Sequence, residues 1–316
     1  MATRRVLITG AGGFIGSHLV ELTVQRGYAV RAFVHYNSLG TAGWLDRSPY
    51  RAQVEIVHGD VRDLDTVAGA VRGCDTVFHL AALIGIPYSY VSPLAYLRTN
   101  LEGTYNVLQA ARDTGVGRVL ITSTSETYGT APNAQSPYAA SKVGADQLAL
   151  SFHRAFGLDV RLVRPFNTYG PRQSARAIIP TIVSQIVAGR TRLRLGNLEP
   201  TRDLTFVLDT VAGFLAIADC ASCVGTATNI GVDEEISIRD LARRIGTLME
   251  VEVSFELDPA RTRPLESEVE RLRCDNRRIR ALTGWSPAST LDAGLRATIG
   301  WLRENVASSP AEGYAI

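Results

Sequence analysis

Short runs of apolar, largely β-branched residues recur along the first half of the chain, and each has the length of a buried strand. Stretches with apolar residues three or four positions apart separate several of these runs, as in amphipathic helices. Strands that alternate with helices favour a doubly wound α/β fold with a mostly parallel sheet. The expected strands are residues 6–9, 29–35, 54–58, 76–80, 118–122 and 160–164.

A glycine-rich turn joins the first expected strand to a helical pattern that starts at Ser17. Glycines at the first, fourth and seventh positions of this turn permit a tight bend, close approach of a pyrophosphate to the helix N-terminus, and close helix–strand packing. A purely structural turn would use the same residues, but this position in the fold favours dinucleotide binding. The expected cofactor contacts are Gly10, Gly13, Phe14, Ile15 and Gly16.

The end of the second expected strand bears on the choice between NAD and NADP. Dinucleotide-binding folds commonly carry an acidic residue here that holds the adenosine ribose, whereas this strand ends in Val34-His35. The missing carboxylate removes a repulsion against a 2′-phosphate, and His35 with residues 36–38 could donate hydrogen bonds to one. No arginine follows directly, so the sequence leaves both cofactors open, with His35 as an expected contact.

The fourth expected strand leads into the expected nicotinamide and sugar sites. Its end, Leu80-Ala81-Ala82, offers small residues beside which a nicotinamide ribose could lie, while His79 is expected to be a core residue. Residues 83–90 are expected to form a loop that is unusually apolar and aromatic, which suits the wall of a sugar pocket. Ile84 and Tyr88 are the expected substrate contacts in this loop.

A catalytic group is expected where the fifth strand ends and the next helix begins. Tyr138 and Lys142 are four positions apart, so on a helix they share one face, and the ammonium would favour the anionic form of the phenol. Thr124, Ser125 and Glu126 follow the strand at residues 118–122, and ligands of open α/β sheets bind at such carboxyl ends. We therefore expect an active site here.

Tyr138-x-x-x-Lys142 with Thr124 resembles the catalytic set of the short-chain dehydrogenases/reductases, in the extended branch that modifies nucleotide sugars, and the resemblance covers nearly the whole chain. The family resemblance that these residues carry implies that all five are catalytic. Thr124-Ser125-Glu126 followed by Tyr128-Gly129 is similar to sugar-nucleotide 4,6-dehydratases and to UDP-glucuronate decarboxylases. C4-epimerases usually carry no acid at the Glu126 position. Ser125, where many dTDP-glucose dehydratases have Asp, makes the chain more similar to GDP-mannose dehydratases and to bacterial amino-sugar dehydratases.

The resemblance implies two lobes and further site residues. A Rossmann domain would span residues 1–165, with returning segments around 204–231, and a smaller α/β substrate lobe would span residues 166–316. Asp60 and Val61, in an adenine-contacting turn, and Pro165 would bind the cofactor, although Asp60 or Asp63 could instead cap a helix. The implied substrate contacts, which could also be ordinary surface charges where they are arginines, are Asn167, Arg202, Arg263 and Glu268, with Glu266 as the alternative to Glu268.

One segment departs from the family pattern. Between Gly129 and Tyr138 the family normally has about ten more residues, forming a loop beside the pocket. In this chain residues 130–137 make the connection. Either the rim of the pocket is short in this protein, or a mobile loop is absent from the sequence.

The resemblance also implies a reaction. Tyr138 would take the C4 hydroxyl proton while hydride leaves C4, Glu126 would remove the C5 proton as water leaves C6, and hydride would return to C6 of a 4-keto-6-deoxy sugar nucleotide. Epimerisation and decarboxylation stay open as alternatives, although no basic residue within residues 83–90 could bind a substrate carboxylate. A non-enzymatic dinucleotide sensor would not keep Tyr138 and Lys142 together.

The composition excludes several other classes of function. A chain of 316 residues with 46% hydrophobic and 20% charged residues is long enough for two lobes, and a net charge of +2 gives no field for nucleic acid. No apolar run approaches the roughly 18 residues of a membrane helix, and four cysteines make no disulfide framework or metal site. A cytoplasmic homodimer, paired through helices at residues 94–112 and 138–156 as in the family, is expected.

Overall fold

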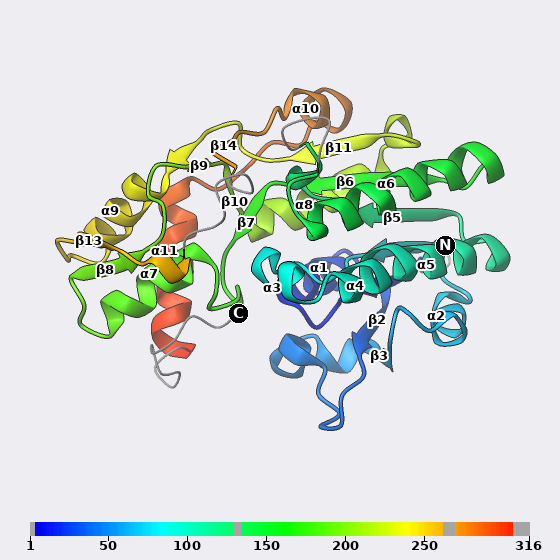
Figure 1. Ribbon diagram of the computed structural model, residues 1–316. Coiled ribbons are helices and arrows are strands. Elements are labelled where there is room, and N and C mark those ends of the chain that lie inside the picture. The colour runs from blue at the N-terminus through cyan, green and yellow to red at the C-terminus, as the bar shows by residue number, and fades with distance from the viewer. Residues whose placement is uncertain (1–3, 129–133, 262–268, 306–316) are drawn as a thin grey trace.

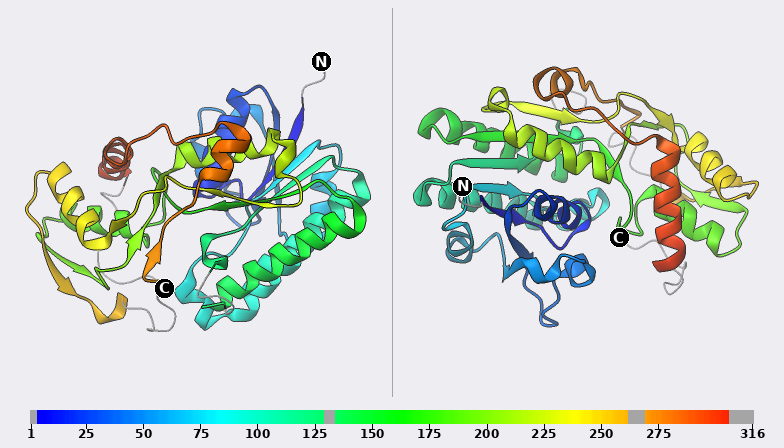
Figure 2. Two further views of the ribbon diagram at one scale, coloured as in Figure 1. Left: turned by 90° about the horizontal axis from the view of Figure 1, so that it is seen from above. Right: turned by 180° about the vertical axis from the view of Figure 1, so that it is seen from behind.

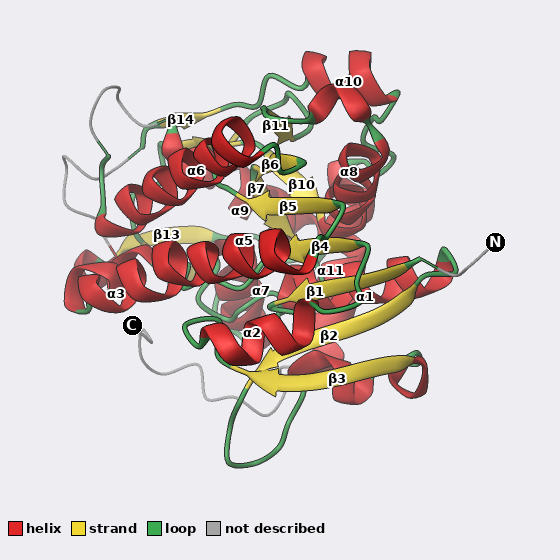
Figure 3. Cartoon of the chain, turned by 90° about the vertical axis from the view of Figure 1, so that its right-hand side faces the viewer, coloured by secondary structure: helices red, strands yellow, loops and turns green. Residues whose placement is uncertain are grey.

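A parallel seven-stranded sheet forms the larger lobe of the chain. The computed structural model describes residues 4–128, 134–261 and 269–305. In the sheet the strands follow the order β11-β6-β5-β4-β1-β2-β3, as Figures 1 and 3 show. The strands are β1 (Arg5–Thr9), β2 (Ala29–His35), β3 (Val54–Gly59), β4 (Thr76–His79), β5 (Arg118–Thr122), β6 (Val160–Pro165) and β11 (Ala227–Ile230). The six expected strands and the doubly wound fold class are thereby confirmed.

Helices cover both faces of this sheet because its strands are apolar on both faces. Leu19 of α1 (Phe14–Gln25) and Phe214 of α8 (Val207–Asp219) belong to the core on one face. The core on the other face is built with α2 (Leu64–Val71), α5 (Gly103–Thr114) and α6 (Pro137–Phe156). In Figure 3, α2, α5 and α6 lie on one side of the strands and α1 and α8 on the other.

The smaller lobe packs three helices against short sheets around a core of its own, and Figure 2 shows it beside the large sheet. Its helices are α7 (Ile178–Val187), α9 (Ile238–Leu248) and α11 (Leu291–Asn305). Its strands are β7 (Asn167–Tyr169), β8 (Arg192–Leu195), β9 (Thr201–Arg202), β10 (Leu204–Phe206), β12 (Ile236–Ser237), β13 (Ser254–Leu257) and β14 (Arg271–Leu272). The chain returns to the large lobe with α8 and β11, followed after β14 by α10 (Arg277–Thr283).

One expectation about local structure is wrong. The expected loop at residues 83–90 contains a short helix, α3 (Ile86–Val91), with Pro87 in the first turn, where a helix tolerates proline. The long helix expected after it is present but not uniform. After α4 (Pro93–Tyr96) it passes through a π-helical turn, Leu97–Glu102, before α5 begins. Such turns are frequent at functional sites.

Candidate active site

The glycine turn between β1 and α1 has no room for side chains. Gly10 adopts a left-handed backbone with φ of 66°. A Cβ on Gly16 would lie 2.2 Å from the carbonyl oxygen of Gly10, and Gly13 occupies the N-cap of α1 without a side-chain cap. The first amides of α1 are therefore accessible to a ligand, and the positive end of the helix dipole favours an anionic one. These residues fit the pyrophosphate of a dinucleotide.

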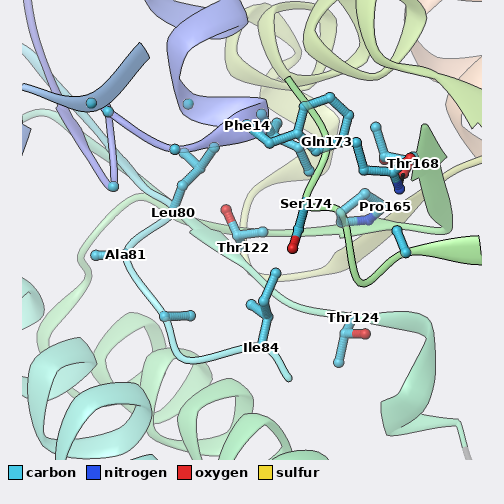
Figure 4. Close-up of a pocket in the computed structure, with 18 of the residues that line it drawn as sticks. Phe14, Leu80, Ala81, Ile84, Thr122, Thr124, Pro165, Thr168, Gln173 and Ser174 are labelled. Atoms are coloured by element: carbon cyan, nitrogen blue, oxygen red, sulfur yellow. Dashed lines mark hydrogen bonds between the residues drawn. The ribbon is translucent and has the colours of Figure 1, made fainter. Parts of the chain in front are cut away.

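A cavity of about 680 Å³ extends from this turn across the carboxyl ends of the central strands to the smaller lobe. Figure 4 shows side chains from four parts of the chain around it: Phe14, Leu80, Thr122 with Thr124, and Gln173 with Ser174. Its volume suits a small-molecule site, and its position at the carboxyl ends of parallel strands is the usual ligand position in this fold class.

Tyr138 and Lys142 line the cavity from the first two turns of α6. The helix begins here because Pro137 occupies its first turn and the Ser136 hydroxyl accepts a hydrogen bond from the amide of Ala139 at 3.1 Å. Tyr138 is 7% exposed and Lys142 is 3% exposed. Both polar groups are therefore held in a largely water-free environment.

Thr124 and Glu126 approach the same cavity from the end of β5. Thr124 caps the 3₁₀ turn Ser125–Thr127, with its hydroxyl accepting a hydrogen bond from the Glu126 amide at 3.3 Å. A side-chain hydrogen bond joins Thr124 to Tyr138. The structure therefore brings the five expected catalytic residues to one cavity, with a threonine hydroxyl beside the phenol and a carboxylate two residues further on.

Burial controls the ionisation of the tyrosine and lysine. It raises the pKa of Tyr138 to about 12, with a further increase from the negative charge of Glu126 and an opposing effect of the Thr124 hydrogen bond. Burial also lowers the pKa of Lys142 to about 8, against which Asp146 acts in the raising direction. The sequence predicted that Lys142 would favour the tyrosinate, but burial is the largest effect and holds the pKa of Tyr138 above its ordinary value.

His79 supports the cavity from below, as the expected core histidine. The Thr104 hydroxyl donates to the Asn100 carbonyl at 2.6 Å and so accepts from Nε2 of His79, 3.2 Å away. Nδ1 then accepts from the Thr9 hydroxyl at 2.8 Å, and the Thr9 oxygen also accepts from the amides of Leu80 and Ala81. These bonds fix the strand end on which Leu80 and Ala81 line the cavity.

A second cavity of about 440 Å³ shares Ser125, Glu126 and Phe166 with the first. Its other lining residues include Tyr128, Asn229, Arg271 and Arg273. Each arginine forms an ion pair, Arg271 with Glu235 and Arg273 with Asp233. Glu126 thus lies between a largely apolar space and one lined by two paired arginines and by Asp275.

The structure gathers most of the expected contacts around the larger cavity. Those that line it are Gly10, Gly13, Phe14, Ile15, Gly16, His35, Leu80, Ala81, Ala82, Ile84, Pro165 and Asn167, together with the five expected catalytic residues.

Several other expected contacts lie elsewhere. Asp60 pairs with Arg62, and Val61 is buried against the helix that contains Gly103, so neither lines the cavity. Asp63, not Asp60, caps α2. Tyr88 and Arg202 also lie outside it: the Arg202 guanidinium donates to the carbonyls of Thr201 and Val269. Arg263, Glu266, Glu268 and part of the 130–137 link fall outside the described residues.

The sequence did not predict some lining residues. Thr41, Ala42 and Gly43 lie beside the glycine turn, and no motif marks them. Gln173, Ser174 and Ala177 belong to the polar segment that follows β7 and precedes α7. The position of this segment, directly after the crossing into the second lobe, was the available signal, because such connections carry ligand contacts.

Other kinds of site find no support in the described parts of the chain. Across residues 4–128, 134–261 and 269–305, no group of three or more His, Cys, Asp and Glu side chains could hold a metal ion. In the same ranges no helix combines the length and apolar character needed to cross a bilayer.

Comparisons with known proteins agree with this geometry. A family model described as GDP-mannose 4,6 dehydratase matches residues 7–298. The chain is 33% identical to a dTDP-glucose 4,6-dehydratase of Streptomyces antibioticus, with 95% of this chain and 92% of the relative covered, and 33% identical to a UDP-glucose 4-epimerase of Mycolicibacterium smegmatis, with 95% and 98% covered. A UDP-N-acetyl-alpha-D-glucosaminuronate decarboxylase of Bacillus cytotoxicus is 31% identical, with 95% and 98% covered.

A solved structure agrees as well. The dTDP-glucose 4,6-dehydratase DesIV of Streptomyces venezuelae, solved with NAD and TYD bound, superposes with a TM-score of 0.85 at 31% identity, covering 95% of this chain and 97% of that one. The chain therefore belongs to the GDP-mannose 4,6 dehydratase family, the nucleotide-sugar dehydratases and epimerases of the extended short-chain dehydrogenase/reductase type, and it is an NAD(P)-dependent enzyme of that family.

Proposed function

We propose that the protein is a nucleotide-sugar 4,6-dehydratase, a lyase that forms a 4-keto-6-deoxy sugar nucleotide. The observation that carries the proposal is the position of Glu126, which lines one cavity with Thr124, Tyr138 and Lys142. A carboxylate beside a tyrosine base supplies the second proton acceptor that elimination requires and that epimerisation does not.

The chain's own residues divide the reaction between them. Tyr138, as the phenolate that the ammonium of Lys142 favours, takes the proton of the C4 hydroxyl and becomes a neutral phenol, assisted by its hydrogen bond with Thr124. Oxidation at C4 acidifies the C5 hydrogen, which Glu126 removes as water leaves C6. Ser125, or the newly protonated Glu126, assists the departure of the hydroxyl.

A nicotinamide cofactor bound in this cavity would supply the hydride acceptor for C4 and the hydride donor for C6. Gly10, Gly13 and Gly16 would hold its pyrophosphate, and His35 with Asn37 lies where the second strand ends, on the wall of the same cavity. Val34 also lines that wall. We propose a tightly bound and recycled cofactor, with either NAD or NADP compatible with these side chains.

The substrate would extend from Thr124 toward the smaller lobe. Asn167 and Ile84 line the cavity there, and we propose that they contact the diphosphate and the sugar. Arg202 and Tyr88 lie outside the cavity. The proposed contact of Arg202 therefore rests on the family resemblance, as do those of Arg263 and Glu268, and that of Tyr88 rests on the apolar and aromatic character of residues 83–90.

Glu126→Gln tests the proposal, because glutamine keeps the shape and hydrogen bonding of the side chain but cannot accept the C5 proton. After substrate is added, C4 should still be oxidised while elimination stalls, so reduced nicotinamide should accumulate and absorb in the near ultraviolet. Glu256→Gln, a surface change distant from the cavity, is the matched control and should behave as the parent. Formation of the 4-keto-6-deoxy product at the parent's rate by Glu126→Gln would refute the role of Glu126.

A second candidate, decarboxylation of a nucleotide-linked hexuronic acid, is favoured by one observation. The sequence showed no cation in residues 83–90 for a substrate carboxylate, but Arg271 and Arg273 line the smaller cavity beside Glu126. Their pairing with Glu235 and Asp233 weakens this support. A panel of UDP-, GDP- and dTDP-linked hexoses and hexuronates, analysed by product mass, separates loss of water from loss of carbon dioxide and from the unchanged mass of epimerisation.

We also propose a homodimer through the helices at residues 94–112 and 138–156. Four large apolar residues on these helices, Leu94, Leu97, Tyr105 and Phe156, expose 42–56% of their surface, and contiguous exposed apolar residues mark interaction sites. Tyr105→Glu should then yield monomers in light scattering, and a parent that is already monomeric would refute this interface. A cytoplasmic location remains part of the proposal, and the four cysteines are free thiols.

A further inference from the structure

The face of α6 that presents the catalytic pair continues into a buried carboxylate. Tyr138, Lys142 and Asp146 follow one another at intervals of four residues, which places them along one face of the helix. Asp146 is 1% exposed and does not line the cavity. A buried carboxylate is costly unless it is paired, so its partners indicate why it is there.

Asp146 binds the strand end that leads to the other catalytic residues. Its Oδ2 accepts hydrogen bonds from the Ser123 hydroxyl at 2.6 Å and from the Arg164 guanidinium at 2.8 Å. Ser123 directly precedes Thr124, and Nε of Arg164 also donates to the Ser123 hydroxyl oxygen at 3.2 Å. One carboxylate oxygen therefore joins α6, the end of β5 and the end of β6.

The same cluster reaches the turn that carries Glu126. The guanidinium of Arg164 lies over the ring of Tyr128, with its central carbon 4.7 Å from the ring centroid. The Tyr128 hydroxyl donates to Oδ1 of Asn229 at 2.8 Å on β11. The 3₁₀ turn Ser125–Thr127 is thus fixed at both ends, by Ser123 before it and Tyr128 after it.

The other oxygen of Asp146 has a different environment. Oδ1 is buried and has no hydrogen-bond partner in the described chain. No ion pair or hydrogen bond of the Lys142 ammonium is found within those residues either, although the charge of Asp146 raises the pKa of Lys142 against the effect of burial. The charged or titratable groups around Lys142 are Tyr138 and Asp146 on α6, His79 on β4, Glu126 after β5, and Arg164 on β6 behind Asp146.

We propose that Asp146 is a positioning residue that aligns the Thr124–Glu126 turn with Tyr138 and keeps Lys142 protonated during hydride transfer. His79 is neutral, and Arg164 already neutralises part of the Asp146 charge. The charges of Lys142 and Arg164 are therefore balanced against that of Asp146, and this balance sets the pH range over which the site is active. The inference rests on the C4 oxidation of the proposed function, a step that dehydration, epimerisation and decarboxylation share.

The test compares pH profiles of turnover on the sugar nucleotide that the enzyme converts. Asp146→Asn keeps the shape and can still accept the Ser123 hydrogen bond, but it removes the charge, so the basic limb of the kcat profile should move to lower pH by about one unit. Asp113→Asn, an exposed carboxylate on α5, is the control and should leave the limb unchanged. An Asp146→Asn profile that is merely scaled down, with its limb unmoved, would mean that Asp146 is structural.

Two further variants complete the test. Arg164→Gln removes the cation that shields Asp146, so the basic limb of the kcat profile should move to higher pH. This variant can refute the inference even if Asp146→Asn does not fold. Ser123→Ala should lower kcat without moving the limb. Tyr138→Phe separates the two proposals. If this variant turns over at the parent's rate, the proposed function fails. If it is inactive, but the basic limb of the kcat profile is unmoved in Asp146→Asn and in Arg164→Gln, this inference alone fails.

Discussion

The neutral, buried His79 should make the folded protein sensitive to mild acid. Its ring is 2% exposed, and burial lowers its pKa from 6.5 to about 3, with a smaller contribution from the positive charge of Lys142. The Thr104 hydroxyl accepts from Nε2, and the Thr9 oxygen already accepts two amide hydrogens. A second proton on this ring would therefore lack a good acceptor.

The size of the effect follows from linkage. The pKa of His79 is lower in the folded than in the unfolded protein, so between pH 6.5 and about 3 the unfolded chain binds a proton there that the folded chain does not. The contribution of neutral His79 to the free energy of unfolding is therefore fully present above pH 6.5 and is lost as the pH falls. Each pH unit within this window costs about 1.4 kcal/mol. At about pH 4.5, two units below the unfolded value, the loss from His79 amounts to roughly 3 kcal/mol.

Urea unfolding of the parent and of His79→Gln at several pH values between about 7 and 4.5 measures this loss. Carboxylates contribute equally to both proteins, so the difference in slope isolates His79. At about pH 7 the free energy of unfolding of His79→Gln should be lower than that of the parent, because glutamine cannot bridge Thr9 and Thr104 in the same way. Between about pH 7 and 4.5, however, the variant should lose roughly 3 kcal/mol less than the parent. His35→Gln, at an exposed histidine, should keep the parent's slope. Parallel curves for the parent and His79→Gln would refute the reasoning.

Three other changes probe the cofactor site and the base. Tyr138→Phe removes the proton acceptor without altering the glycine turn, so turnover should fall by about 10²-fold or more while cofactor still copurifies; near-normal turnover would mean that another group is the base. Gly16→Ala forces a methyl group to within 2.2 Å of the Gly10 carbonyl oxygen and should abolish copurification, whereas Gly69→Ala, with open space around it, should not; cofactor retained by Gly16→Ala would contradict the close-packed turn. Val34→Asp should shift cofactor preference toward NAD in competition binding, and the expectation fails if the parent has no measurable affinity for NADP.

The sequence predicted those parts of the fold that depend on local pattern. The strands were recognisable because runs such as Val6–Thr9 are buried on both faces, and the glycine turn because its residues obey backbone constraints. The helix α3 was missed because six residues that include Pro87 carry no periodic signal. Asn100 in the π-helical turn binds both the amide and the carbonyl of Leu83, a tertiary interaction that no local pattern encodes.

In the site, too, the residues marked by a local sequence pattern were predictable, and those that depend on the whole fold were not. Thr124, Glu126, Tyr138 and Lys142 come from two adjacent segments with recognisable spacing, so the sequence was sufficient to select them. The lining residue Gln173 carries no such spacing, and only the position of its segment after the crossing into the second lobe could have indicated it. The ionisation of Tyr138 was not predictable from its spacing to Lys142, because burial is a property of the whole fold.

The seventh strand of the large sheet has a consequence for synthesis of the protein. β11 pairs with β6 through Ala227 and Leu162, and α8, which packs on α1, is made shortly before it. Between β6 and these elements the chain builds much of the smaller lobe. While the chain is still being synthesised, the large lobe therefore has an unpaired sheet edge at β6 and an apolar face of α1 that α8 does not yet cover. Chaperones that shield such surfaces should associate with this protein until residue 230 has left the exit tunnel.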